Sequence, residues 1–210
     1  MSYPDRRAAG AALAARLADL GITEPAIVLG LVRGGVPVAA EIAQRLGLPL
    51  DVLVVRKLGV PWAPEVAFGA LGPRGVRVLN EDISARLTPE EIAAVVRHES
   101  AELHRRERRF RAGRPELDLA GQTALIVDDG LATGATARAA VAVARKLHAA
   151  RIVLAVPVGS VEAVDQLGEL ADEVVCPLTP PDFGAVSRFY DNFTQVSDAE
   201  VVSLLESSHV

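Results

Sequence analysis

The chain has few of the residues on which disulfide-bonded, zinc-binding and membrane-spanning proteins depend. Its 210 residues include one cysteine, Cys176, so no internal disulfide can form. The four histidines are not spaced with this cysteine as zinc ligands are, and we expect no zinc site. No apolar run approaches the ~18 residues that a membrane span needs. The first residues, MSYPDRRAAG, contain no apolar signal core, so we expect a cytoplasmic protein with no membrane partner.

Excess positive charge and aromatic rings are scarce as well. The net charge is −5, which provides no general attraction to nucleic acid. Aromatic residues make up only 4% of the chain, and no aromatic platform is interleaved with the arginines at 97–114, which argues against RNA binding. Hydrophobic residues, by contrast, make up 50%, enough for a sizeable core. We therefore expect a single domain over residues 1–210.

Short apolar runs alternate with amphipathic helical patterns along the chain. The runs predict five buried strands, at 26–32, 50–57, 123–128, 151–157 and 173–177. Helices are predicted at 4–20, 37–46, 88–112, from 137 to about 149, and from 160 to about 170. Strand–helix–strand units favour parallel pairing with right-handed crossovers. The pattern therefore predicts an α/β fold, a doubly wound, mainly parallel five-stranded sheet flanked by helices, with its core at about 22–178.

One stretch, TALIVDDGLATGAT at 123–136, combines acidic, small and hydroxyl residues. Its apolar start predicts a buried strand, and Asp128 and Asp129 stand where that strand ends. The small residues and the hydroxyls of Thr133 and Thr136 then suit a phosphate-binding loop, because backbone N–H groups can approach an anion closely there. The two carboxylates suit sugar hydroxyls, hydrated Mg²⁺ or a developing cation instead. The alternative is an ordinary strand-to-helix turn, whereas a kinase-type loop is excluded because no Gly-Lys-Ser/Thr follows.

This stretch resembles the motif of type I phosphoribosyltransferases that binds phosphoribosyl pyrophosphate (PRPP). The resemblance implies catalytic roles for Asp128 and Asp129, which would hold the ribose hydroxyls directly or through water bound to Mg²⁺. Their charge would also stabilise an oxocarbenium-like transition state. The residues that would bind the 5-phosphate are Gly130, Ala132, Thr133, Gly134, Ala135 and Thr136.

Two basic stretches stand at the ends of predicted strands, Arg33-Gly34-Gly35 after 26–32 and Arg56-Lys57 within 50–57. The carboxyl ends of parallel strands form the usual ligand edge of such sheets. The alternatives are a tight turn with a solvated arginine and a solvated strand end. Both stretches resemble segments of purine and adenine phosphoribosyltransferases that face the diphosphate. The residues that would bind pyrophosphate are Arg33, Gly34, Gly35, Arg56 and Lys57.

Residues 58–78 are rich in proline and glycine, so we expect no long regular element, only a short antiparallel pair between 66–71 and 76–79. In the resembling family this position holds a flexible loop that closes over the reacting sugar and excludes water. Glu65 is a candidate catalytic proton acceptor for the incoming base, although an exposed loop glutamate is usually only solvated. Trp62 is expected to pack against the body rather than to cover a ligand.

The helix predicted at 88–112 starts with a capping box and is basic in its second half. Three interpretations stay open: a solvated face with i,i+4 ion pairs, a subunit contact, or a weak RNA-binding face. The arginines concerned are Arg97, Arg105, Arg106, Arg108, Arg109, Arg111 and Arg114.

Residues 179–196 hold most of the aromatic rings and weakly resemble the hood of xanthine-guanine phosphoribosyltransferases. The rings either stack on a planar base or pin the C-terminal segment to the body. Candidate base-binding residues are Phe183, Tyr190 and Val156. The strand that contains Val156 ends without the lysine of hypoxanthine-guanine enzymes, and Ala132 replaces their aspartate. The resemblance therefore does not favour a 6-oxopurine, and the acceptor stays open.

The resemblance covers about 26–195 and implies a nucleotide-salvage enzyme with Mg²⁺ as cofactor. Such an enzyme transfers 5-phosphoribosyl from PRPP to a nitrogen base and releases pyrophosphate, and the resemblance also implies a homodimer. The alternative is a PRPP-sensing regulator of the same fold that binds nucleic acid through the arginine-rich helix. The net charge of −5 argues against a nucleic-acid partner. A scaffold with a vestigial site is hard to reconcile with an intact motif at 128–136.

Overall fold

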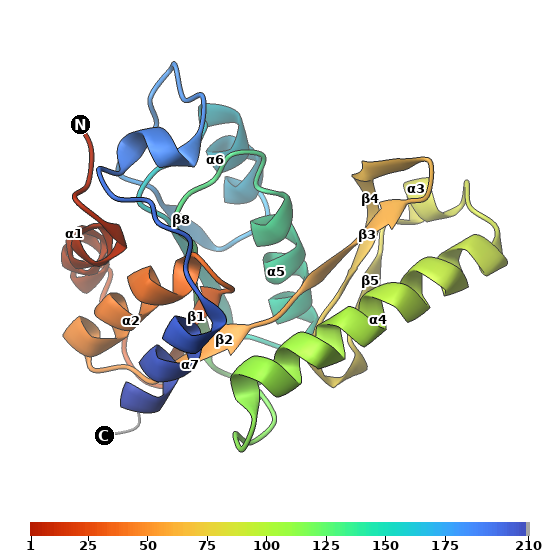
Figure 1. Ribbon diagram of the computed structural model, residues 1–210, viewed down its shortest axis with the longest axis horizontal. Coiled ribbons are helices and arrows are strands. Elements are labelled where there is room, and N and C mark those ends of the chain that lie inside the picture. The colour runs from red at the N-terminus through yellow and green to blue at the C-terminus, as the bar shows by residue number, and fades with distance from the viewer. Residues whose placement is uncertain (209–210) are drawn as a thin grey trace.

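A parallel five-stranded sheet lies at the centre of the computed structural model, which describes residues 1–208 (Figure 1). Neighbouring strands are parallel throughout, and β1, β2, β6 and β7 consist largely of buried residues. The predicted α/β fold and its five parallel strands are therefore confirmed. The strand order is β2 (Leu50–Leu53), β1 (Ala26–Leu31), β6 (Thr123–Val127), β7 (Arg151–Ala155) and β8 (Glu173–Val175).

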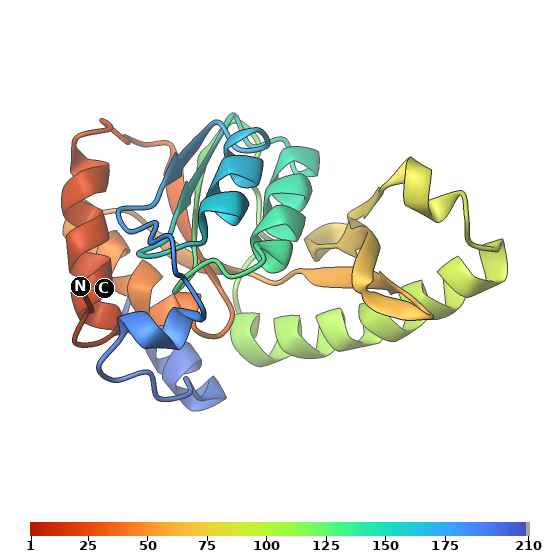
Figure 2. The ribbon, with the colours of Figure 1, turned by 90° about the horizontal axis from the view of Figure 1, so that it is seen from above.

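Helices cover both faces of this sheet, which makes it doubly wound (Figure 2). One face packs on α1 (Arg6–Ala18) and α2 (Gly35–Leu46), and the other on α5 (Ala135–Lys146) and α6 (Val161–Gly168). Alternate residues of β6 serve the two faces, since Leu125 joins the first core and its neighbour Ile126 the second. Apolar residues on both sides of the strand are what such a buried parallel sheet requires.

A second, antiparallel sheet extends away from the body together with a long helix. Its strands are β3 (Arg56–Val60), β4 (Ala63–Leu71) and β5 (Arg77–Leu79), followed by the short α3 (Glu81–Ser84) and by α4 (Pro89–Arg111). We call residues 56–111 the arm (Figures 1 and 2). The capping box at Thr88 begins α4, as the sequence predicts.

The arm corrects two predictions. Residues 50–57 are not one strand, because β2 ends at Leu53 and β3 begins at Arg56 in the other sheet. The proline-rich stretch also contains a regular element, the nine-residue β4. Its pairing with β3 is interrupted by register shifts beside Gly59, and Pro64 lies within that irregularity, where no ladder N–H is needed. The expected antiparallel pairing with 76–79 is present as β4–β5.

A buried ion cluster joins the arm to the body. Asp51 of β2 accepts hydrogen bonds from Nε and Nη2 of Arg111, at 3.0 and 2.9 Å, and Arg114 lies 3.5 Å away. All three side chains are largely buried. This cluster connects the end of α4 to the central sheet.

The chain end passes back over the body. Residues 179–196, the hood, contain a short 3-10 helix (Val186–Phe189), and α7 (Asp198–Ser207) follows. The N-terminal segment lies beside the hood, where the Tyr3 N–H donates to the Phe189 carbonyl at 2.8 Å. Within residues 1–208, none of the helices combines the length and apolarity that crossing a membrane requires.

Candidate active site

The aspartate pair, Asp128 and Asp129, lies at the carboxyl end of the central strand β6. The Asp129 N–H donates to Oδ1 of Asp128 at 2.9 Å, which orients the Asp128 carboxyl group. Burial raises the pKa of Asp128 well above its usual value, and the charge of Asp129 raises it further. Burial also raises the pKa of Asp129, although Arg6 opposes this rise.

Arg6 is a functional candidate that the sequence analysis missed. Its Nε and Nη2 atoms each lie 2.9 Å from Oδ2 of Asp129, and its side chain is largely buried. Its guanidinium also lies 4.0 Å from the centre of the Phe193 ring, and it donates to the Thr194 carbonyl at 2.7 Å. Arg6 thereby fixes one carboxylate oxygen and leaves the other available. No local pattern pointed to it, because the contact spans more than half of the chain.

The backbone at Gly34 and Gly35 packs directly against the aspartate pair. A Cβ atom on Gly34 would overlap the Asp129 carboxylate, and one on Gly35 would lie 2.9 Å from the Asp128 Cα. Only glycine permits this approach, so the sequence Gly34-Gly35 is needed here for contact rather than for a turn alone. The loop that follows β1 and the motif that follows β6 thus form one edge, as the parallel sheet predicts.

The loop at 130–136 leads from the aspartate pair into the N-terminus of α5. Gly134 precedes α5 with φ +73°, a conformation that suits glycine. Ala132, Thr133 and Thr136 are exposed, so the loop presents its hydroxyls and backbone to solvent. Ser160 holds this loop in place, because its hydroxyl donates to the Ala132 carbonyl at 2.8 Å. An exposed loop before a helix N-terminus can bind an anion.

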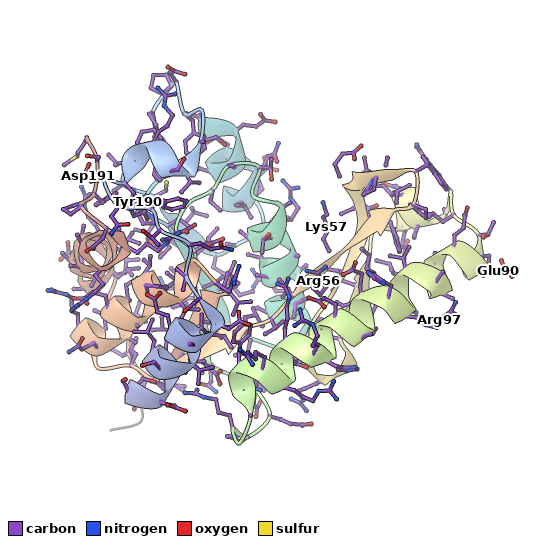
Figure 3. All side chains as sticks on the ribbon, viewed as in Figure 1. Arg56, Lys57, Glu90, Arg97, Tyr190 and Asp191 are labelled. Carbon is purple, nitrogen blue, oxygen red and sulfur yellow. The ribbon has the colours of Figure 1, made fainter. Side chains whose placement is uncertain are left out.

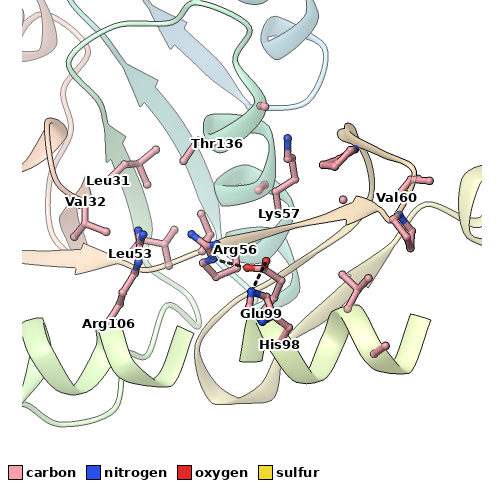
Figure 4. Close-up of a pocket in the computed structure, with 18 of the residues that line it drawn as sticks. Leu31, Val32, Leu53, Arg56, Lys57, Val60, His98, Glu99, Arg106 and Thr136 are labelled. Atoms are coloured by element: carbon pink, nitrogen blue, oxygen red, sulfur yellow. Dashed lines mark hydrogen bonds and ion pairs between the residues drawn. The ribbon is translucent and has the colours of Figure 1, made fainter. Parts of the chain in front are cut away.

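The main cavity, of about 750 Å³, lies between this loop and the arm (Figure 4). Lys57 of β3 and Thr136 of α5 both line it, together with Val32 just after β1. Arg56 also lines it, but its Nε donates to Glu99 of α4 at 2.6 Å. The two predicted basic residues of β3, Arg56 and Lys57 (Figure 3), therefore line the same cavity as Thr136.

A family comparison identifies this arrangement. The profile of the phosphoribosyl transferase domain matches residues 3–194. The chain belongs to the phosphoribosyl transferase domain family. Its fold is the type I phosphoribosyltransferase fold that the motif at 123–136 led us to expect.

Two curated relatives from Mycobacterium tuberculosis, MT0597 and Rv0571c, are provisionally named phosphoribosyl transferases. Each is 54% identical to this chain over 209 residues, which are 99% of the chain and 47% of the relative. The chain thus spans about half the length of these relatives. Among solved structures, TT1426 from Thermus thermophilus is 43% identical, covers 99% of both chains and superposes with a TM-score of 0.93.

In this phosphoribosyl transferase domain the backbone of Gly34 and Gly35 contacts the aspartate pair, but the side chain of Arg33 lies elsewhere. Its Nη1 lies 3.4 Å from Oδ1 of Asp198, at the start of α7. Its side chain is 37% exposed, and it lines a separate cavity beside α4. The predicted stretch is therefore divided, with its backbone at the aspartates and its guanidinium turned to α7.

Glu65 lies on β4, not in a loop, and its side chain is exposed. It lines a side cavity of about 520 Å³ between β4 and α5, which also contains Arg138 and the shared Lys57. The aspartate pair does not line this side cavity, and neither Glu65 nor the aspartate pair lines the main cavity in this conformation. The expectation for Trp62 is wrong, because its side chain lies 65% exposed at the end of the β3–β4 hairpin.

The three candidate base-binding residues are buried. Tyr190 is 6% exposed and donates its hydroxyl to the Asp129 carbonyl at 2.7 Å (Figure 3). Phe183 stacks on Phe189 with ring centres 5.6 Å apart, and Val156 lies fully in the core. Burial also raises the pKa of the Tyr190 hydroxyl, which stays a neutral donor. These three side chains therefore pack against other parts of the protein, and the two rings have little exposed surface on which a base could stack.

The carboxylates of the aspartate pair suit a cation that is bound jointly with substrate. Within residues 1–208 no cluster of three or more His, Cys, Asp or Glu side chains could hold a metal by itself. Mg²⁺ commonly retains several waters and binds through one or two carboxylates together with substrate phosphates. Two partly buried carboxylates beside an anion-binding loop fit that mode.

Proposed function

We propose that this protein transfers the 5-phosphoribosyl group of PRPP to a nitrogen base. The bond from C1 of the ribose to pyrophosphate would break, and a bond from C1 to the base nitrogen would form. Family membership and the edge where Gly34-Gly35 meets the aspartate pair support this reaction. That contact is the observation that carries the proposal, because it brings the loop that would bind pyrophosphate beside the two carboxylates that would hold the sugar.

In this proposal the exposed loop binds the 5-phosphate. The N–H groups of Gly134 and Ala135 and the hydroxyls of Thr133 and Thr136 would donate to it at the start of α5. The positive end of the helix dipole adds to the attraction.

The aspartate pair would hold the ribose hydroxyls and stabilise the positive charge that develops at C1. Arg6 would keep Asp129 in place, and the Asp129 N–H would keep Asp128 in place. Bound Mg²⁺ would supply charge neutralisation for the pyrophosphate, through water at these carboxylates. Gly34, Gly35 and Lys57 would contact the leaving pyrophosphate, and Arg56 and Arg33 would do so after exchanging their present carboxylate partners.

The acceptor would enter from the side of the arm or the hood. Closure of residues 58–78 over the sugar would exclude water and bring Glu65 toward the reacting centre. Phe183, Tyr190 and Val156 are buried, so they would form the packed layer under the base-binding part of the site and would not stack on the base itself.

The first test is PRPP binding by titration calorimetry with Mg²⁺. The native protein should bind in the micromolar range, and Asp128→Asn/Asp129→Asn should not bind. Asp19→Asn/Asp165→Asn removes the same charge from two exposed positions, one just after α1 and one on α6, and should bind like the native protein. No binding by the native protein up to millimolar PRPP would sink the proposal.

The second test identifies the acceptor. Candidate bases are incubated with protein, PRPP and Mg²⁺, and released pyrophosphate is measured. A true acceptor gives release that depends on both PRPP and the base and that disappears in the double variant. Release without any base would indicate hydrolysis only.

A further inference from the structure

Four arginines converge on a cavity distinct from the main cavity, and one of them, Arg33, is also a proposed pyrophosphate contact. The cavity, of about 400 Å³, lies between α4, α7 and the end of β1. We call it the arginine pocket; its lining residues are Val32, Arg33, Arg105, Arg106, Arg109, Phe110 and Asp198.

Positive charge exceeds negative charge around the arginine pocket. Asp198 is the acidic partner of both Arg33 and Arg109, at 3.4 and 3.3 Å. Glu102 is the acidic partner of both Arg105 and Arg106, at 2.8 Å each. The four guanidinium groups thus share two carboxylates, which leaves two positive charges in excess.

Most of the donors in this pocket are available to a ligand. A guanidinium carries five N–H donors, and the contacts of Arg33 and Arg109 with Asp198 are longer than a charge-assisted hydrogen bond usually is. The side chains of Arg105 and Arg109 are 62% and 59% exposed. A planar fork of donors matches phosphate oxygens, and several forks around one cavity suit several phosphates in series.

We propose that the arginine pocket binds a di- or triphosphate group, at a site separate from that of PRPP. The concave arrangement favours a small anion over an extended nucleic acid, because arginines from two elements distant in sequence face one cavity. The phosphates can come from an inorganic polyphosphate or from a nucleotide.

The arginine pocket is connected to the proposed active site through two residues. Arg106 also lines the main cavity with Lys57 and Thr136, and it extends from α4 toward Leu53 and Val32 (Figure 4). Arg33 is joined to the Gly34-Gly35 backbone at the aspartate pair. An anion that replaces Asp198 as the partner of Arg33 would therefore move the Arg33 side chain, which belongs to the stretch Arg33-Gly34-Gly35 that we propose to bind pyrophosphate. Its binding should alter PRPP affinity by a limited factor, as coupled sites do.

The test uses tripolyphosphate as the probe, titrated calorimetrically into the native protein and two variants. Arg105→Gln/Arg109→Gln should weaken tripolyphosphate binding at least tenfold. Arg97→Gln/Arg108→Gln removes the same charge from exposed positions on α4 outside the pocket and should leave it unchanged. Asp198→Asn should strengthen binding, because it removes the competing carboxylate.

PRPP titrations at rising tripolyphosphate concentration separate this site from the active site. The apparent PRPP dissociation constant should reach a plateau, whereas a shared site would raise it without limit. A nucleoside triphosphate in place of tripolyphosphate shows whether the natural ligand carries a nucleoside. The probe titration needs no PRPP, so its result is independent of whether the proposed reaction is correct.

Three results would overturn the inference. The first is no tripolyphosphate binding by the native protein, and the second is equal loss in the pocket and control variants. The third is retention on RNA that falls steeply with salt and is weakened alike by both double variants, which would indicate a general basic face.

Discussion

At the residue scale, the aspartate pair combines chemical use with a cost in stability. Asp128 lies partly buried at the end of β6 beside a second carboxylate, and both the burial and the neighbouring charge raise its pKa. A carboxyl that ionises less readily in the folded than in the unfolded state destabilises the fold when it is charged. Functional sites commonly hold such groups.

We expect Asp128→Asn to stabilise the protein while it abolishes PRPP binding. Because the folded pKa of Asp128 is raised, the native protein loses stability as the pH rises from the ordinary carboxyl pKa of about 4 through the raised folded value. Asp128→Asn should lose less free energy of unfolding over this pH range. At about pH 8 its melting temperature should be higher than that of the native protein, by roughly 2–4 °C for each 1 kcal/mol of added stability. Thermal melts between about pH 5 and pH 8 measure the difference.

Asp165→Asn, on the exposed side of α6, is the matched control and should reproduce the native pH profile. If Asp128→Asn melts below the native protein at about pH 8, the burial argument is wrong.

We expect Gly34→Ala to weaken PRPP binding about tenfold or more, a loss of about 1.4 kcal/mol. The added Cβ atom would overlap the Asp129 carboxylate and displace either that group or the loop. The measurement is PRPP calorimetry, with the melting temperature as a check on folding. Gly168→Ala is the control, because a Cβ there meets no atom within 4 Å. An unchanged dissociation constant for Gly34→Ala would show that the loop can move aside.

At the element scale, the arm supplies basic residues that the sequence analysis assigned to a strand of the central sheet. The sequence predicted one strand over 50–57, but the chain leaves the central sheet after Leu53 and joins the antiparallel sheet at Arg56. Arg56 and Lys57 therefore reach the main cavity from the arm, not from the sheet. An apolar run cannot distinguish these two outcomes, because the two residues between the strands, Val54 and Val55, are themselves apolar and continue the run.

We expect Asp51→Asn to destabilise the protein by roughly 3 kcal/mol or more, because it leaves Arg111 and Arg114 buried without their carboxylate. Urea denaturation gives the change in the free energy of unfolding. Glu116→Gln, which removes an exposed and distant partner of Arg74, should change it by less than about 1 kcal/mol. Equal effects of the two variants would mean that the buried cluster does not hold the arm.

At the scale of the whole molecule, the body and the arm enclose the main cavity between them (Figures 1 and 4). The apolar Trp62 is exposed at the end of the β3–β4 hairpin, on the arm. A ligand that bridges Thr136 and Lys57 would connect the two parts. The flexible loop expected at 58–78 corresponds to a hairpin in the structure, and its closure remains a prediction.

We expect PRPP with Mg²⁺ to slow amide hydrogen exchange in the β3–β4 hairpin, because closure would remove its backbone from solvent. Mass spectrometry of peptides covering 56–71 measures this, and the central strand β6 should change little. Asp128→Asn/Asp129→Asn with the same PRPP is the control and should show no slowing. Unchanged exchange in the native protein at saturating PRPP would mean that the arm does not close.

The homodimer and the cytoplasmic location remain predictions at this scale. The α/β class and the strand number were predictable because they follow from repeated local patterns of apolar and polar residues. The contacts of Arg6 and Arg33 were not predictable from such patterns, because each contact joins segments more than a hundred residues apart.

The sequence by itself therefore determined the five parallel strands, the helices between them and the position of the aspartate pair at a strand end. Strand and helix periodicity is a property of neighbouring residues, and the edge at which parallel strands end follows from their direction. Only the tertiary structure decided that Arg6 holds Asp129, that Arg33 turns to Asp198, and that β3 belongs to the arm. Those outcomes depend on which surfaces pack together, and the free energy of such packing is shared among residues that are distant in the chain.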